Sequence, residues 1–142
     1  MARIFLEIIT PERVVVSEEV DIVTAPGVEG EFGVLANHAP MVAAVKIGPL
    51  RYRVGDREEW LAISGGFCKV SENKITFLVE AAERAYEIDV ERALRAKERA
   101  EKRLQEYQTK AEQIDYARAR AALQRALTRL LVAEKGKAGH PR

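Results

Sequence analysis

The sequence has few of the side chains from which metal and redox sites are built. Its 142 residues include one cysteine, Cys68, and two histidines, His38 and His140. One cysteine cannot form an internal disulfide, and together with two histidines it cannot supply the four ligands of a structural zinc site. We therefore expect a protein of a reducing compartment with no metal centre.

Long apolar runs are also missing. No window approaches the roughly 20 consecutive apolar residues that a membrane-spanning helix needs. The opening segment, residues 1–7, reaches the acidic Glu7 before a signal-type apolar run develops. The sequence therefore predicts neither direct membrane insertion nor secretion.

Glycine and proline are absent from residues 82–135. Residues 1–84 instead contain short runs rich in valine, isoleucine and aromatic residues, separated every several residues by glycine, proline, asparagine or aspartate. This spacing predicts an antiparallel sheet, closed or sandwiched, over residues 1–84. The strong helix formers of residues 85–135 predict a two-helix antiparallel hairpin, followed by a flexible tail over residues 136–142. The expected strands are Ile4–Ile9, Val14–Val16, Val20–Thr24, Met41–Ile47, Leu50–Val54, Trp60–Ser64, Phe67–Val70 and Lys74–Val79.

The first helix of the hairpin is predicted to begin at Asp89, whose carboxylate can accept a hydrogen bond from the free N–H groups of the first turn. Its apolar stripe is thin and consists mainly of Ala93, Ala96 and Ala100. A break is expected over residues 107–114. Since alanines bury little area, we expect the hairpin to open easily.

Charge is divided unevenly between the two regions. Residues 1–84 carry a net charge of −4 and residues 85–142 a net charge of +5. Residues 116–133 contain no acid. At about 100° per residue, the leucines of the second helix fall on one face and Arg118, Arg125 and Arg129 on the opposite face. The arginines of this acid-free stretch are Arg118, Arg120, Arg125 and Arg129.

Three interpretations of the arginine face remain open. Arginines opposite a leucine face usually form a solvated surface. A nucleic-acid patch is disfavoured because no aromatic residues alternate with the arginines and the whole chain is nearly neutral. A phosphate site is the third interpretation, since several guanidinium groups on one face can hold a polyphosphate.

Catalytic signatures are missing. The chain contains neither GxxxxGK[ST] nor GxGxxG. His38 lies in a segment with no evident serine or cysteine partner, so it is interpreted as a loop-fixing residue rather than a general base. We expect no catalytic residues.

Three segments carry a family resemblance: the loop Gly30–Pro40, the turn Ser64–Phe67 and the helix opening Ile88–Ala93. Together, in this order, they resemble the epsilon subunit of bacterial F-type ATP synthases, and the match runs from Thr10 to Glu134. The resemblance implies a ten-stranded β-sandwich followed by a two-helix hairpin, in a peripheral subunit of the central stalk on the cytoplasmic face of the cell membrane. It also implies the gamma subunit and the ring of c subunits as partners, with the alpha and beta subunits contacted when the hairpin extends.

The helix opening also resembles the family members that bind ATP, because Ile88, Asp89, Arg92 and Ala93 complete the pattern Ile/Leu-Asp-x-x-Arg-Ala. The resemblance implies ATP as a regulatory ligand, with or without Mg²⁺, that holds the hairpin compact. Its implied adenosine contacts are Glu83, Ile88, Asp89 and Ala93. Its implied phosphate contacts are Arg92, Arg125 and Arg129, with Arg99 and Arg118 as further candidates.

Two functions follow as hypotheses. The first is a non-catalytic stalk subunit that couples gamma to the c ring and inhibits ATP hydrolysis through its hairpin. The second is a free-standing nucleotide- or nucleic-acid-binding module with no role in an assembly. The two differ in whether the sheet surface is an interface.

Overall fold

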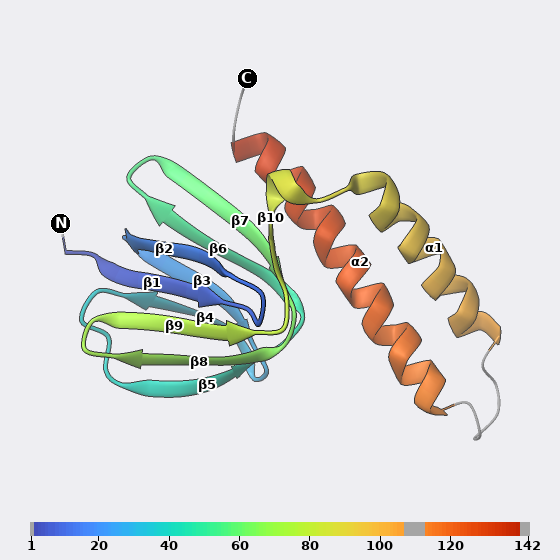
Figure 1. Cartoon of the computed structure of the whole chain (residues 1–142), viewed down its shortest axis with the longest axis horizontal. Coiled ribbons are helices and arrows are strands. Elements are labelled where there is room, and N and C mark those ends of the chain that lie inside the picture. Colours follow the sequence, from blue (N-terminus) through green and yellow to red (C-terminus); the bar gives the residue numbers. More distant parts are fainter. Residues whose placement is uncertain (1, 107–112, 140–142) are drawn as a thin grey trace.

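A computed structural model of the chain describes residues 2–106 and 113–139, in which ten strands precede two long helices (Figure 1). This arrangement confirms the predicted α+β fold. The strands are β1 (Ile4–Ile9), β2 (Val14–Val20), β3 (Ile22–Gly27), β4 (Gly30–Leu35), β5 (Met41–Val45), β6 (Gly48–Val54), β7 (Arg57–Ile63), β8 (Gly66–Ser71), β9 (Lys74–Val79) and β10 (Ala82–Arg84). The helices are the short 3₁₀ turn η1 (Ala85–Glu87), α1 (Val90–Glu106) and α2 (Gln113–Gly139).

The strands form one sheet that folds over into two layers. Its order is β10-β7-β6-β3-β5-β8-β9-β1-β2, with β4 added to β3. Strand β3 pairs with β6 through its first half and with β5 only at Gly27 and Val45, so it forms the corner between the layers. The described strands pair antiparallel except β1 and β9, which run parallel.

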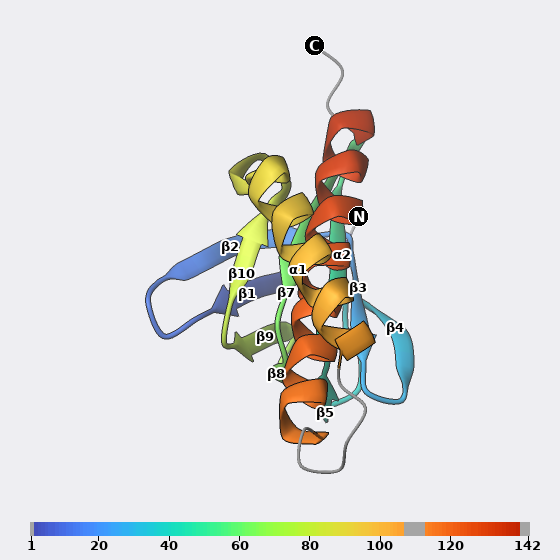
Figure 2. The same cartoon turned by 90° about the vertical axis from the view of Figure 1, so that its right-hand side faces the viewer.

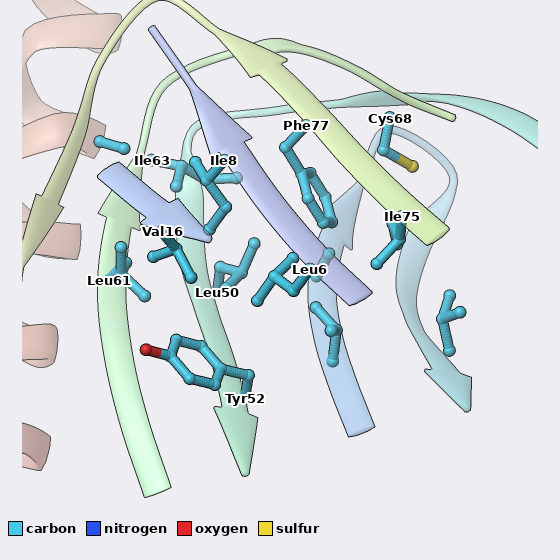
Figure 3. Close-up of a cluster of buried hydrophobic side chains, with 14 of the residues drawn as sticks. Leu6, Ile8, Val16, Leu50, Tyr52, Leu61, Ile63, Cys68, Ile75 and Phe77 are labelled. Carbon is cyan, nitrogen blue, oxygen red and sulfur yellow. The ribbon is translucent and has the colours of Figure 1, made fainter. Parts of the chain in front are cut away.

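The hydrophobic core lies between the two layers. Alternate residues of β1, namely Ile4, Leu6 and Ile8, are fully buried, as the period of two along a strand requires. Figure 3 shows their neighbours from the other strands, among them Phe77 and Tyr52. These large side chains hold the sheet domain together independently of the helices.

Eight of the ten strands were located from the sequence pattern, and two were not. Residues 30–40 resembled a loop, but residues 30–35 form β4, which pairs with β3 around a two-residue turn. Gly30 has a φ of 133° at this turn, which only glycine adopts readily. Strand β10 is three residues long and extends the edge at β7.

The second helix packs on the sheet, and the first helix packs on the second. In Figures 1 and 2, α2 lies against the sheet and α1 lies beside α2. Alanines spaced by seven residues occupy buried positions on both helices: Ala93 and Ala100 on α1, and Ala119, Ala126 and Ala133 on α2. Neither helix is apolar and long enough, within its described residues, to cross a bilayer.

The end of α2 differs from the sequence prediction. The helix does not stop before Gly136 but continues to Gly139. Gly136 is buried against Ala85 of η1, where a side chain would collide, so packing on the sheet domain extends the helix past the glycine. Most of the predicted break, residues 107–112, and the tail residues 140–142 lie outside the described part of the chain.

Candidate functional site

The junction between β10 and α1 is tied to the sheet by a carboxylate. Glu87 of η1 accepts hydrogen bonds from the backbone N–H of Arg84, at 3.0 Å, and from the guanidinium of Arg13, at 2.9 and 3.1 Å. Arg13 lies at the turn between β1 and β2. These hydrogen bonds connect the first residues after β10 to the sheet domain.

The side chain of Arg84 points back into the sheet domain. It donates to the hydroxyl oxygen of Tyr52 and to the carbonyl oxygen of Val15, both at 3.1 Å. The Tyr52 hydroxyl donates in turn to Glu18 at 2.8 Å. Burial and the hydrogen bond to Glu18 raise the pKa of Tyr52 to about 12, so the phenol stays neutral at physiological pH.

The start of α1 confirms the predicted N-cap. One carboxylate oxygen of Asp89 accepts from the backbone N–H of Arg92 at 3.1 Å, and its carbonyl oxygen accepts from Ala93 at 3.0 Å. A side-chain oxygen in this position satisfies one of the free donors of the first turn. Asp89 itself is exposed at the surface, so its second carboxylate oxygen is open to other interactions.

The second helix docks on the sheet through a small apolar cluster. Its buried members are Ala62 of β7, Ile88 of the junction, and Val132 and Ala133 of α2. Trp60, the single tryptophan of the chain, packs against this cluster. The Lys135 ammonium of α2 lies 5.9 Å from the Trp60 ring centroid, within the range of a cation–π contact.

Two arginines of α2 face the sheet beside this cluster. The Nε of Arg129 lies 2.5 Å from a carboxylate oxygen of Glu83 in β10, and both side chains are about one-third exposed (34% and 32%). Arg125 and Thr128 line the same small hollow as Arg129 and Glu83. The hollow holds about 10 Å³, which is room for one water molecule at most.

Because Arg125 and Arg129 are half-buried at the contact with the sheet, they do not belong to a solvated face of α2. The sequence pattern suggested a buried leucine face with arginines in solvent, but Leu127 and Leu131 are 45% and 39% exposed. The arginine side of α2 meets the sheet domain because Val132 packs in the apolar cluster on that side and Gly136 allows η1 to approach closely. Arg118, at the far end of α2, is exposed.

The structure brings some of the predicted site residues together and leaves others apart. Glu83, Arg125 and Arg129 share one hollow. Ile88 and Ala93 are buried in the packing of the helices, whereas Asp89, Arg92 and Arg99 are exposed on α1. Sequence reasoning missed Thr128 of the hollow, although it lies three residues after Arg125 and therefore near the same face of a helix.

A second surface feature was not predicted at all. The pairing of β5, β8, β9, β1 and β2 aligns one outward-facing apolar residue from each strand. Phe67 and Leu78, in its centre, are 61% and 58% exposed. We call this row of Ala44, Phe67, Leu78, Ile9 and Val14 the apolar row. An exposed apolar patch of this kind marks an interaction surface.

The described residues contain no group of three or more histidine, cysteine, aspartate or glutamate side chains placed to hold a metal ion. His38 places its ring Nδ1 2.7 Å from the carbonyl oxygen of Ala39, within its own loop. This contact agrees with the loop-fixing interpretation. The candidate site is therefore the contact of α2 with β10 and η1, and the candidate interface is the apolar row.

Comparisons with known proteins agree with the sequence resemblance. The family model for the β-sandwich domain of the ATP synthase delta/epsilon chain matches residues 3–85, and the model for its long α-helix domain matches residues 86–134. The ATP synthase epsilon chain of Syntrophobacter fumaroxidans is 56% identical over 133 residues, covering 94% of this chain and 97% of the relative. That of Nitratidesulfovibrio vulgaris strain DP4 is 54% identical over 127 residues, covering 89% and 92%.

Solved structures give the same result. A chain in the cryo-EM structure of the Euglena gracilis mitochondrial ATP synthase, which contains OSCP, F1 and the c ring, superposes with a TM-score of 0.79 at 28% identity and covers 95% of this chain and 82% of its own. A chain of the Tetrahymena thermophila central stalk and c ring shares the fold, with a TM-score of 0.59 at 17% identity and coverage of 92% and 93%. The chain therefore belongs to the family of ATP synthase epsilon chains.

Proposed function

We propose that the chain is a non-catalytic rotor subunit that joins the gamma subunit to the ring of c subunits and regulates ATP hydrolysis through an ATP-sensitive hairpin. It works as a peripheral subunit at the cytoplasmic face of the cell membrane. Family membership supports the place in the central stalk. The regulatory part is supported by one observation: two arginines of α2, a residue type that binds phosphate, lie at its contact with the sheet, where Arg129 pairs with Glu83.

The apolar row is the proposed contact with gamma. It crosses five strands, so it offers a rigid, flat surface about 20 Å wide at the strand spacing of about 4.8 Å. Exposed aromatic and aliphatic side chains at the centre of a patch are the usual anchors of a protein interface. A partner that covers Phe67 and Leu78 would remove this apolar surface from water.

A binding assay with purified gamma subunit tests this assignment. Phe67→Asp and Leu78→Asp in the full chain should weaken binding by at least tenfold, because an acid would be buried without a partner. Leu35→Asp is the matched control, since Leu35 is 57% exposed on β4, outside the row. Equal losses for the control would contradict the assignment. A wild-type chain that fails to bind gamma would favour a free-standing nucleotide- or nucleic-acid-binding module.

The arginines of both helices fall on one side of the hairpin. At about 100° per residue, Arg125 and Arg129 lie roughly 40–120° from the alanine positions that line α2, and Arg92 and Arg99 lie roughly 80–120° from those of α1. The displacement has the same rotational sense on each helix, and in an antiparallel pair this places both sets on the same side. That side faces the sheet, because Arg129 reaches Glu83.

This arrangement suits a polyphosphate that bridges the helices. Guanidinium groups from both helices can bind its phosphate oxygens as bidentate donors. Asp89, with an exposed carboxylate at the start of α1, is placed to accept from the hydroxyl or amino groups of an adenosine. A ligand that touches both helices and the β10 edge binds only the docked hairpin.

Selective binding makes ATP a stabiliser of the docked state. At a free concentration of 100 times Kd, it favours that state by about 2.7 kcal/mol, a roughly hundredfold change in population. When ATP is scarce, the helices can extend, contact the alpha and beta subunits through the basic side of α2, and restrain hydrolysis. The subunit thereby responds to the energy state of the cell.

Calorimetric titration of the full chain with ATP, ADP and AMP, each with and without Mg²⁺, tests the nucleotide site. We expect one site that binds ATP most tightly, and the double variant Asp89→Ala with Arg92→Ala should abolish binding. Arg125→Gln should weaken ATP binding about tenfold. Arg120→Gln, which removes an exposed charge from the other side of α2, should leave it unchanged. Absence of saturable heat with ATP would refute the site.

A further inference from the structure

The apolar row ends beside the junction that leads to the helices. Its last two members, Ile9 of β1 and Val14 of β2, pair with each other across the turn between these strands. The turn is held by Thr10, whose hydroxyl oxygen accepts from the backbone N–H of Arg13 at 3.2 Å. Arg13 directly precedes Val14, and its guanidinium donates to Glu87 of η1. The 3₁₀ turn η1 therefore lies next to the end of the row.

One large side chain of η1 is left in solvent. Tyr86 is 80% exposed, which is more than Phe67 or Leu78 in the centre of the row. A single exposed apolar residue is common on a soluble protein and needs no explanation. Tyr86 differs because it directly precedes Glu87, the residue through which η1 is joined to the turn at the end of the row. It therefore lies at the border of the exposed surface that the row forms.

We infer that the interface of the apolar row continues across the Arg13–Glu87 pair to Tyr86, and that the gamma subunit contacts this tyrosine. This inference rests on the proposed contact of the row with gamma. Tyrosine is one of the residue types that most often anchor a protein interface, because its ring buries a large area while its hydroxyl still forms a hydrogen bond. The gamma surface that fits is apolar opposite the row and carries a polar group opposite the Tyr86 hydroxyl. The interface then reaches the segment that leads into α1.

The pair between Arg13 and Glu87 positions Tyr86. Glu87 accepts two hydrogen bonds from Arg13 and one from the backbone N–H of Arg84, so η1 is connected both to β10 and to the turn between β1 and β2. The Arg13 and Glu87 side chains are 50% and 28% exposed, and an ion pair so open to water contributes little to stability by itself. Its effect on binding is to reduce the conformational freedom that η1 loses when gamma covers it. Arg13 is thus a positioning residue for this contact.

Titration of the full chain with purified gamma subunit tests the inference. Tyr86→Ala should weaken binding about tenfold, the size expected for an aromatic anchor. Tyr116→Ala is the matched control, because it removes an exposed tyrosine from the end of α2 that lies away from η1, and it should leave binding unchanged (Figure 1). Both variants should unfold in urea like the wild type, since both side chains are at the surface. Unchanged binding by Tyr86→Ala, or an equal loss in Tyr116→Ala, would overturn the inference.

A second pair of variants tests the role of Arg13. Arg13→Gln should weaken gamma binding about two- to fivefold, and it should cause no further loss in a Tyr86→Ala background, because it acts through the tyrosine. Arg3→Gln breaks a comparable ion pair, with Asp21 at the other end of β1, and should leave binding unchanged. A further loss of full size in the double variant would show that Arg13 contacts gamma itself, and it would overturn the positioning role.

The variants of the row separate this inference from the proposed function. If Phe67→Asp and Leu78→Asp weaken binding but Tyr86→Ala does not, the proposed contact with gamma stands and the inference fails. If the row variants bind gamma like the wild type, or if the wild-type chain does not bind gamma, the proposed contact fails and the inference with it.

Discussion

The sheet domain and the helical hairpin bury very different side chains. The sheet encloses large residues such as Phe77, Tyr52 and Leu6 between its layers, whereas the buried positions of the helices are mostly alanines. A fully buried large aliphatic side chain contributes about 1.5–3 kcal/mol, and an alanine contributes far less. We therefore expect the docking of the helices to be less stable than the sheet domain, so that a ligand that binds only the docked helices would change their position and leave the sheet unaffected.

The largest effect should come from the core of the sheet. Phe77→Ala removes a fully buried ring from β9 and should lower the free energy of unfolding by about 3–5 kcal/mol. Leu78→Ala, one residue along the same strand, is 58% exposed and should change it by less than about 0.5 kcal/mol. Urea unfolding followed by circular dichroism measures both. Similar losses for the two variants would contradict the claim that the buried core between the layers stabilises the sheet domain.

The next effect is a loss of sheet stability at high pH, which we expect from the buried phenol of Tyr52. The pKa of Tyr52 is raised to about 12 in the folded chain, above about 10 in the unfolded chain, so the folded state holds the proton more tightly. Its contribution is complete below pH 10 and is lost as the pH rises toward 12, with a total on the order of 2 kcal/mol. Tyr52→Phe should show no such loss in urea unfolding between these pH values. A loss of equal size in Tyr52→Phe would show that another group titrates.

A smaller loss of free energy is expected when the docking of α2 on the sheet is weakened. Val132→Ala trims a fully buried side chain in the apolar cluster and should weaken docking by about 1–2 kcal/mol without altering unfolding of the sheet. Trp60 reports the result, because its emission should shift to longer wavelength when α2 leaves. Leu131→Ala, at an exposed neighbouring position, is the control and should leave the emission unchanged. A loss of sheet stability in Val132→Ala would contradict the independence of the two regions.

The smallest effect is expected at the helix cap. Asp89→Ala should destabilise the first turn of α1 by about 1 kcal/mol, whereas Asp89→Asn, which still caps, should cost much less. Hydrogen exchange of the α1 amides compares the two. If both variants bind ATP as weakly as each other, the carboxylate charge contacts the ligand. If only Asp89→Ala loses binding, the role of Asp89 is to cap the helix.

Much of this architecture was predictable from local pattern. Alternating burial in β1 and the capping position of Asp89 follow from periods of two residues and from the chemistry of helix ends. Strand β4 was not predictable from local pattern. Its residues Gly30 and Gly33 are typical of loops, and the segment forms a strand because it pairs with β3. Pairing that depends on a distant strand, such as the parallel contact of β1 with β9, leaves no local signal.

The site was predictable in its residues but not in its geometry. The spacing of Arg125 and Arg129 places them on one face of a helix, yet it does not say which face meets the sheet. That choice depends on Val132 and Gly136, whose fit against the sheet domain and η1 is a tertiary property. The apolar row arises in the same way, because Phe67, Leu78 and Ile9 become neighbours only through strand register.

Hydrogen exchange of the full chain, with saturating ATP, with AMP and without nucleotide, tests the central claim most directly, because it reports each region separately. The account predicts that ATP slows exchange in α1 and α2 by about a hundredfold at 100 times Kd, that AMP slows it less, and that the amides of β1, β6 and β9 do not respond. Exchange in the helices that is as slow as in the sheet without nucleotide, or that ATP leaves unchanged, would contradict it.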